Sequence, residues 1–110
     1  MATSKEYKDY VLEQLNLLDN ITTRYMMSEY ILYYNGVIFG GIYDDRLLVK
    51  KVKSNEKYNM KEVIPYTNAK PMFYVEDIDN QDNIKEIVID TYNDLKGLKK
   101  WANTKSYGII

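Results

Sequence analysis

Five charged side chains lie among Tyr-, Ile- and Val-rich runs between residues 21 and 50, and they are the best candidates for binding chemistry: Arg24, Glu29, Asp45, Arg46 and Lys50. An arginine guanidinium binds a carboxylate or a phosphate through two parallel hydrogen bonds, so these residues could form an anion-binding or partner-binding patch. The alternative is structural, because residues on adjacent strands also form cross-strand ion pairs or a solvated edge. The sequence leaves both interpretations open.

Two uncharged residues beside this group, Met27 and Tyr30, extend the candidate partner-binding surface. Adjacent residues of a strand face opposite sides, so at most one of Met26 and Met27 should belong to the core. A methionine outside the core offers an adaptable contact, although core or dimer packing also explains the pair. Tyrosine is amphipathic and favours half-buried or contact surfaces, and the chain contains 12 of them.

Most standard catalytic and metal sites are excluded by composition. The chain has no His and no Cys, so the usual zinc sites, Cys–His pairs and Ser–His–Asp triads cannot form. It also lacks a phosphate-binding glycine loop and a nucleophile elbow. Asp77, Asp79 and Asp82 lack the glycine and terminal glutamate of a calcium loop, and helix capping explains them. We therefore predict no catalytic, cofactor-binding or metal-binding residue and a non-enzymatic protein.

Length and charge indicate one ordinary domain. A chain of 110 residues matches the size of a single domain. Fifteen basic against sixteen acidic residues give a net charge of −1, without a general nucleic-acid footprint. The absence of cysteine, of an N-terminal apolar segment and of any stretch of about 20 apolar residues predicts a cytoplasmic protein without a membrane partner.

The C-terminal residues are basic and aromatic, and they form a second, weaker candidate site. We expect a domain over residues 1–97 and a tail or short final helix over 98–110. Lysine charge and tryptophan stacking could together contact nucleic acid, which makes a transcription accessory role an alternative. The candidate contacts are Lys96, Lys99, Lys100 and Trp101. A solvated tail, or a tryptophan that anchors the tail to the domain, is the plainer interpretation.

Periodicity and turn residues predict the elements of the first half. Ser4 should cap an amphipathic helix over residues 4–18, because Tyr7, Val11, Leu15 and Leu18 share one face. Four antiparallel strands should follow as a meander, over residues 21–26, 29–34, 37–43 and 46–50. Asn35-Gly36 is a strong hairpin signal. Gly40-Gly41 indicates a bulge, a strong twist or a close backbone approach.

The second half is predicted as helix, strand and helix. Residues 54–62 could form a short helix capped by Ser54. Residues 72–76 read as a fifth strand, and Asp79 should cap a long amphipathic helix. Lys96-Gly97 should end that helix as a cation followed by a C′ glycine.

The predicted order is therefore α-ββββ-α-β-α, an α+β fold in which two helices cover one face of an antiparallel sheet in two layers. In the second strand, Tyr30, Leu32 and Tyr34 face one side and Glu29, Ile31 and Tyr33 the other, so neither face is clearly polar. A second subunit on the uncovered face would explain this pattern. We therefore expect a homodimer.

The chain resembles the N-terminal domain of the TfoX/Sxy family of competence regulators, in a single-domain, stand-alone form. The matching segments span about residues 3–95 and are clearest at 24–30, 33–36, 39–45, 47–50, 65–66 and 69–72, and at Val75. The resemblance implies a two-layer α/β domain with an antiparallel sheet, similar to secretion-chaperone-like folds. It also implies a regulatory role, since two-domain members control competence genes.

These observations favour a small, non-enzymatic regulatory domain that binds an unidentified protein through its sheet surface. Two alternatives stay open. One is the nucleic-acid role of the tail, and the other is a small-ligand pocket between the sheet and the helices, for which the sequence offers no positive signal.

Overall fold

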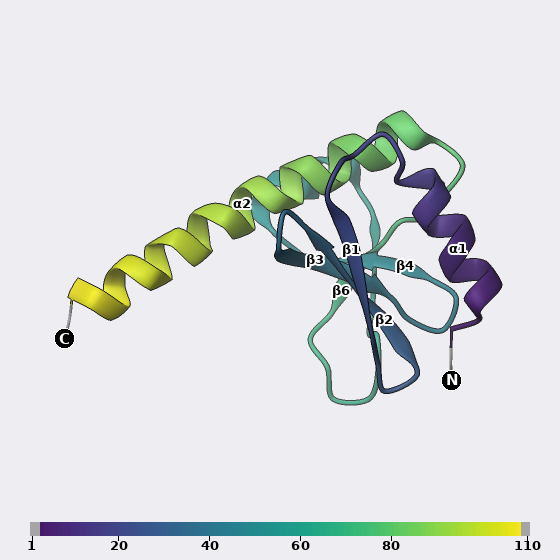
Figure 1. Cartoon of the computed structure of the whole chain (residues 1–110), viewed down its shortest axis with the longest axis horizontal. Coiled ribbons are helices and arrows are strands. Elements are labelled where there is room, and N and C mark those ends of the chain that lie inside the picture. Colours follow the sequence, from purple (N-terminus) through teal and green to yellow (C-terminus); the bar gives the residue numbers. More distant parts are fainter. Residues whose placement is uncertain (1–2, 109–110) are drawn as a thin grey trace.

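A computed structural model describes the backbone of residues 3–108 and the side chains of residues 3–96. The elements are α1 (Lys5–Gln14), β1 (Ile21–Met26), β2 (Glu29–Tyr34), β3 (Val37–Ile42), β4 (Leu47–Val49), the 3₁₀ helix η1 (Lys53–Tyr58), β5 (Lys61–Val63), β6 (Met72–Tyr74) and α2 (Gln81–Gly108). Figure 1 shows the strands crossing below α2, with α1 at one end of the sheet. The predicted α+β class is confirmed. None of the helices within residues 3–108 has the length and apolar content needed to cross a membrane.

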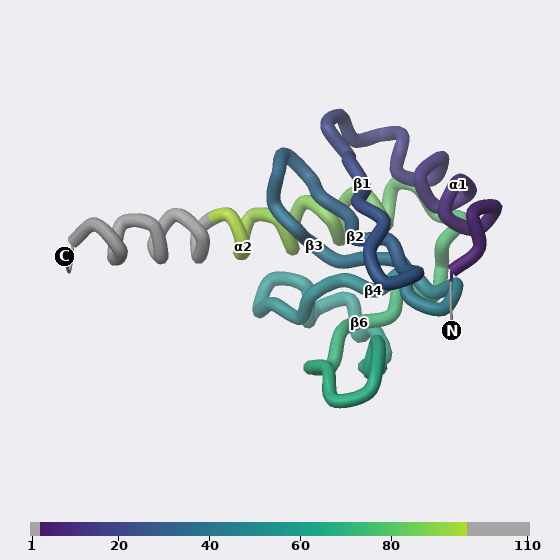
Figure 2. Tube along the Cα trace, turned by 60° about the horizontal axis from the view of Figure 1, so that its bottom comes forward, coloured from purple at the N-terminus to yellow at the C-terminus, as the bar shows by residue number. Residues whose placement is uncertain are grey.

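The strands form one antiparallel sheet of six strands in the order β1-β2-β3-β4-β6-β5. The predicted meander is confirmed for β1 to β4, and Figure 2 shows the strands following one another from β1 to β6. The predicted helix over 54–62 is wrong in its second part. There η1 ends at Tyr58, Asn59 adopts a left-handed φ of 55°, and β5 begins at Lys61. Because β5 exists through its pairing with the distant β6, local periodicity does not reveal it.

Three two-residue turns join β1 to β4 into consecutive hairpins. Both residues of each turn have positive φ angles, as in type I′ turns, whose twist matches that of the strands. The angles are 53° and 69° for Met27 and Ser28, 49° and 78° for Asn35 and Gly36, and 54° and 55° for Asp44 and Asp45. Asn and Asp tolerate this conformation well, whereas methionine does not.

The core lies between the helices and one face of the sheet. The register places Leu32, Ile42 and Val49 on the same face, and all three are fully buried. They pack with Val11 of α1, with Leu15 and Leu18 just after it, and with Ile84, Ile87 and Val88 of α2. The predicted apolar stripes are confirmed, and so is the opposite orientation of Tyr30 and Glu29. We call the side of the sheet that packs against the helices the helix face, and the opposite side the open face.

The ends of the helices differ from the predicted ones. Ser4 Oγ accepts a hydrogen bond from the Tyr7 N–H at 3.1 Å, as expected of the cap, but α1 ends at Gln14. Asn80, not Asp79, caps α2, because its Oδ1 accepts from the Asn83 N–H at 3.1 Å. The predicted end at Lys96-Gly97 is wrong, since α2 continues to Gly108. A glycine inside a helix costs only about 1 kcal/mol when good helix formers surround it.

Gly40 shows why β3 contains a glycine pair. A Cβ atom there would meet the Leu48 carbonyl oxygen and lie 2.9 Å from Val49 Cα. Between β2 and β3 the register shifts at Leu32 and Tyr33, so that Phe39 becomes an extra residue in β3. Phe39 is fully buried. The predicted close approach and bulge are therefore both present.

Polar contacts tie η1 to α2. The buried Asn55 donates to the Lys50 carbonyl oxygen at 2.8 Å and to Thr91 Oγ1 at 2.9 Å. The Tyr58 hydroxyl donates to Asp90 Oδ2 at 2.5 Å, and Lys57 Nζ lies 3.1 Å from the same oxygen. The Tyr58 hydrogen bond, followed by Lys57, lowers the pKa of Asp90. This group of side chains is structural, because it fixes the chain after β4 against the helix.

Candidate functional site

The open face carries apolar side chains but receives neither α1 nor α2. The cross-strand register places Ile31 and Leu48 there with the turn-flanking Tyr43, and the segment of residues 64–71 lies beside them. Leu48 is fully buried and Tyr43 is 9 % exposed, although neither belongs to the core cluster under the helices. The segment 64–71 therefore covers part of the open face and accounts for some of its apolar residues.

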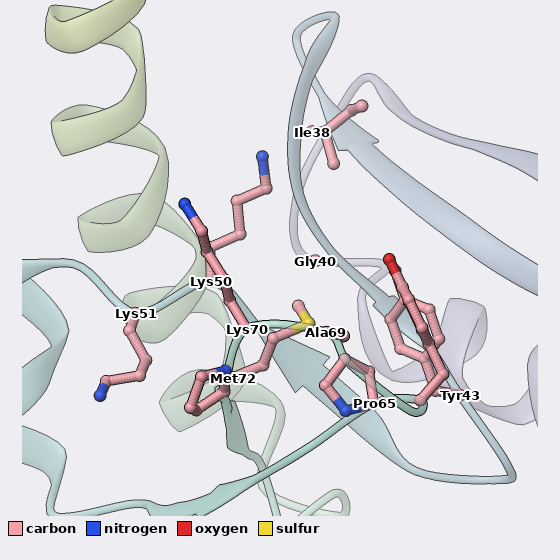
Figure 3. A pocket seen from close by; sticks show the side chains of 11 residues that line it. Ile38, Gly40, Tyr43, Lys50, Lys51, Pro65, Ala69, Lys70 and Met72 are labelled. Carbon is pink, nitrogen blue, oxygen red and sulfur yellow. The ribbon is translucent and has the colours of Figure 1, made fainter.

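A depression of about 710 Å³ lies between this segment, the strand β3, the residues that follow β4 and the start of β6 (Figure 3). Its floor and walls are largely apolar, and its charged residues are all lysines. The lining residues are Ile38, Gly40, Tyr43, Lys50, Lys51, Pro65, Tyr66, Ala69, Lys70, Pro71 and Met72. An apolar depression with a cationic margin suits a ligand that combines apolar groups with carboxylates.

The lysines of this depression differ in orientation. Figure 3 shows the side chains of Lys50 and Lys70 pointing to the same side of the depression, whereas Lys51 points away. Lys51 Nζ forms an ion pair with Glu62 Oε1 at 2.8 Å. Within residues 3–96, neither Lys50 nor Lys70 forms an ion pair. Both are exposed, so their charges are available to an incoming anion.

A second depression, of about 380 Å³, continues the surface toward β1 and β2. It is lined by Met26, Met27, Glu29, Ile31, Tyr43 and Tyr66. The two depressions share Tyr43 and Tyr66, whose ring centroids are 6.2 Å apart. Burial, followed by the neighbouring Tyr66 and Glu29, raises the pKa of Tyr43, so its phenol stays neutral. We call the two depressions together the open-face groove.

The methionines at this end of the groove lie outside the core. Met26 is 41 % exposed and Met27 is 90 % exposed. Core packing therefore does not explain either residue. Their side chains instead form an apolar and adaptable margin of the groove, of the kind that accommodates varied partners.

Two of the predicted acidic residues hold the N-terminal segment in place. Glu29 Oε1 accepts from the Thr3 hydroxyl at 2.7 Å, and both its carboxylate oxygens lie 3.2 Å from the Asp44 backbone nitrogen. Asp45 Oδ1 accepts from the Ser4 N–H at 2.9 Å. Glu29 and Asp45 thus join the start of α1 to two hairpin turns. These bonds give both carboxylates a structural role.

The remaining predicted residues do not gather at one point. Arg24 is exposed on β1, and β2 and β3 separate it from β4, which Lys50 follows, so the two cations do not converge on a cleft. Arg46 donates through Nε to the Tyr43 carbonyl oxygen at 3.2 Å. Tyr30 lies on the helix face, with Lys8 Nζ 5.4 Å from its ring centroid. Of the predicted partner-binding residues, Met27, Glu29 and Lys50 line the groove.

The predicted nucleic-acid contacts lie mostly outside the residues whose side chains the structure describes. This applies to Lys99, Lys100 and Trp101. Lys96 is exposed on α2, and its Nζ is 5.4 Å from the centroid of the Tyr92 ring.

The groove also contains residues that were not predicted as a site, chiefly Tyr43, Tyr66 and Lys70. All three fall in the segments that carry the family resemblance, which was the available signal. Across the described part of the chain, no group of three or more acidic side chains is placed to hold a metal ion. The groove's residue types suit binding of an apolar, anionic ligand.

The family of the chain follows from its similarity to known proteins. No match is found among curated proteins. The family model described as the TfoX N-terminal domain matches residues 13–105, which includes the strands, the segment 64–71 and both margins of the groove. That range covers most of the 110 residues. The chain therefore belongs to the TfoX N-terminal domain family.

Proposed function

We propose that this domain is a non-enzymatic regulatory module that binds a segment of another protein in the open-face groove. The observation that supports this most strongly is the groove itself. A sheet face that served only the fold would be covered or polar, whereas this face keeps an apolar groove beside two lysines that form no ion pair within residues 3–96.

The chemistry of the groove defines the partner segment. Tyr43, Tyr66 and Pro65 offer flat apolar surfaces to aliphatic or aromatic side chains. Lys50 and Lys70 offer charge to Asp or Glu side chains, and the lining of the larger depression contains no acidic residue to compete. An extended segment with apolar residues flanked by carboxylates fits both features. Such a segment would gain affinity from burial and specificity from charge.

The experiment is selection of a phage-displayed random peptide library on the purified protein. The wild type should enrich peptides in which apolar residues alternate with Asp or Glu. The Lys50→Glu/Lys70→Glu variant should bind these peptides at least about tenfold more weakly, because charge reversal replaces attraction by repulsion. Fluorescence anisotropy with a selected peptide measures the change.

Lys85→Glu is the control, because Lys85 is also exposed but lies on α2, away from the groove. This variant should bind like the wild type. The proposal fails if no peptide family is enriched, or if the groove variant and the control bind selected peptides equally well.

A further inference from the structure

The strand β1 is an uncovered edge of the sheet. Its six residues pair with β2 on one side only, and all except Ile21 are exposed. The opposite edge, β5, has three residues and presents the charged Lys61 and Glu62. Short and charged edges discourage pairing with another strand, whereas a long edge with unpaired backbone groups favours it. The two edges therefore differ in the property that controls strand addition.

The register shows which backbone groups of β1 are unpaired. In a two-residue hairpin, the residues that flank the turn, Met26 and Glu29, form a hydrogen-bonded pair, and such pairs alternate along the ladder. The hydrogen bond of 3.2 Å from the Asn35 N–H to the Asn20 carbonyl oxygen fits the same alternation. The N–H and C=O groups of Ile21, Thr23 and Tyr25 therefore point outward. No other segment of residues 3–108 hydrogen-bonds to them.

We propose that β1 pairs antiparallel with β1 of a second copy of this chain, around a two-fold axis at Thr23. This register places Thr23 opposite the partner's Thr23 and Ile21 opposite the partner's Tyr25, so all three outward-facing residues bond across the interface. Ile21 and Tyr25 form an aliphatic–aromatic pair on the helix face, and Arg24 lies opposite the threonine at position 22. Such cross-strand pairs stabilise sheets.

A register shifted by one residue is less favourable. Centring the axis on Arg24 would place two arginines directly opposite each other and leave the groups of Ile21 without a partner. Like charges in opposing positions destabilise a strand pair. The side chains of β1 thus select the register centred on Thr23.

The two-fold axis of such a pair is perpendicular to the sheet, so the sheets of the two protomers become continuous. Both open faces then lie on one side of the dimer, and α1 and α2 of each protomer lie on the other. Met26 and Met27 are at the margin of the groove nearest β1, so the two grooves would flank the seam. The dimer would therefore present two binding grooves to one partner. Two linked sites raise the apparent affinity for a partner with two suitable segments.

Thr23→Pro tests the strand pairing. Its N–H points outward, so proline removes a donor needed between protomers without removing a bond to β2. The dimer dissociation constant from sedimentation equilibrium should rise at least about tenfold. Thr23→Ala retains the backbone donor and should remain a dimer, and circular dichroism should show that both variants keep the wild-type fold.

Amide hydrogen exchange and cross-linking give readouts that do not depend on proline. The amides of Thr23 and Tyr25 should become protected as protein concentration increases. The chain has no cysteine, so two copies of the Thr23→Cys variant should be joined by a short bis-maleimide, whereas two copies of Lys61→Cys, on the opposite edge, should not.

A wild-type monomer at about 200 µM overturns the proposal. So does a dimer that survives Thr23→Pro while the Thr23 and Tyr25 amides of the wild-type dimer stay unprotected, because it would use another surface. Lys50→Glu/Lys70→Glu should leave dimerisation unchanged, which separates this proposal from the groove proposal.

Discussion

Met27 combines an unfavourable backbone conformation with near-complete exposure. Its φ of 53° lies in the left-handed region, where a side chain without local hydrogen-bonding ability is strained, and it is 90 % exposed. The β2–β3 turn uses Asn35-Gly36 for the same geometry. A residue that opposes its local conformation and gains no burial is best explained by a contact with another molecule. Met27 lines the groove, which agrees with the proposed partner site.

Replacing Met27 by Asn should therefore stabilise the fold and weaken binding. We expect the free energy of unfolding to increase by about 0.5–1 kcal/mol, because Asn tolerates the left-handed region. Urea unfolding measures this gain, and anisotropy with a groove-binding peptide measures the loss of affinity. Met26→Asn is the control, since Met26 is in β1 with a negative φ and should show no stability gain. An unchanged or lower stability of Met27→Asn would contradict the expectation.

At the scale of elements, the contact between η1 and α2 positions the segment that follows β4. Asp90 on α2 accepts hydrogen bonds from Tyr58 and Lys57, and these contacts hold its pKa below the usual 3.8. A carboxyl whose pKa falls on folding stabilises the folded state above its unfolded pKa. That contribution disappears as the pH falls through the folded pKa.

Asp90→Asn tests this contact by its pH dependence. Near neutral pH the variant should be less stable than the wild type by about 1–2 kcal/mol, because it loses a charged acceptor. The difference should shrink as the pH falls from about 4 downward. Urea unfolding at several pH values measures it. Asp77→Asn is a control, since Asp77 is exposed and has no hydrogen-bond partner among residues 3–96. A difference in the free energy of unfolding between wild type and variant that stays constant down to pH 2 would exclude this role for the Asp90 charge.

At the scale of the whole molecule, the core that the structure describes is built from side chains between residues 7 and 95. The buried hydrophobic side chains described lie between Val11 and Val88, and Leu95 is the last residue that packs against them. The predicted domain over residues 1–97 is compatible with this distribution and stays a prediction.

Removal of residues 97–110 should leave the free energy of unfolding within about 1 kcal/mol of the full chain. Thermal and urea unfolding of the shortened protein check this directly. A loss of cooperative unfolding would show that the domain extends further.

The same shortened protein tests the alternative that the C-terminal residues bind nucleic acid. Binding to DNA that weakens steeply with salt and disappears with these residues would favour that role over a purely protein-binding one.

Local signals predicted the elements that depend on local chemistry. Asn35-Gly36 indicated its hairpin because a type I′ turn needs two positive φ angles, and this was correct. The capping role of Ser4 and the stripe at Val11 and Leu15 were also correct, since both follow from helix geometry. The end of α2 was wrong, because Gly97 resembles a helix stop but only weakens a helix. The positions of Arg24 and Tyr30 relative to Lys50 depend on sheet order and register, which no local pattern contains.

The sequence by itself determined the α+β class, the β1–β4 meander and the apolar faces of the helices, because turns, caps and periodicity act over a few residues. The family followed separately, from the resemblance of its segments to known members. Only the tertiary structure decided that β6 lies between β4 and β5 and that the segment 64–71 forms one wall of a groove. It also decided that Lys50 and Lys70, far apart in the chain, line the same groove. These features arise from contacts between distant residues, whose free energies exist only after the chain has folded.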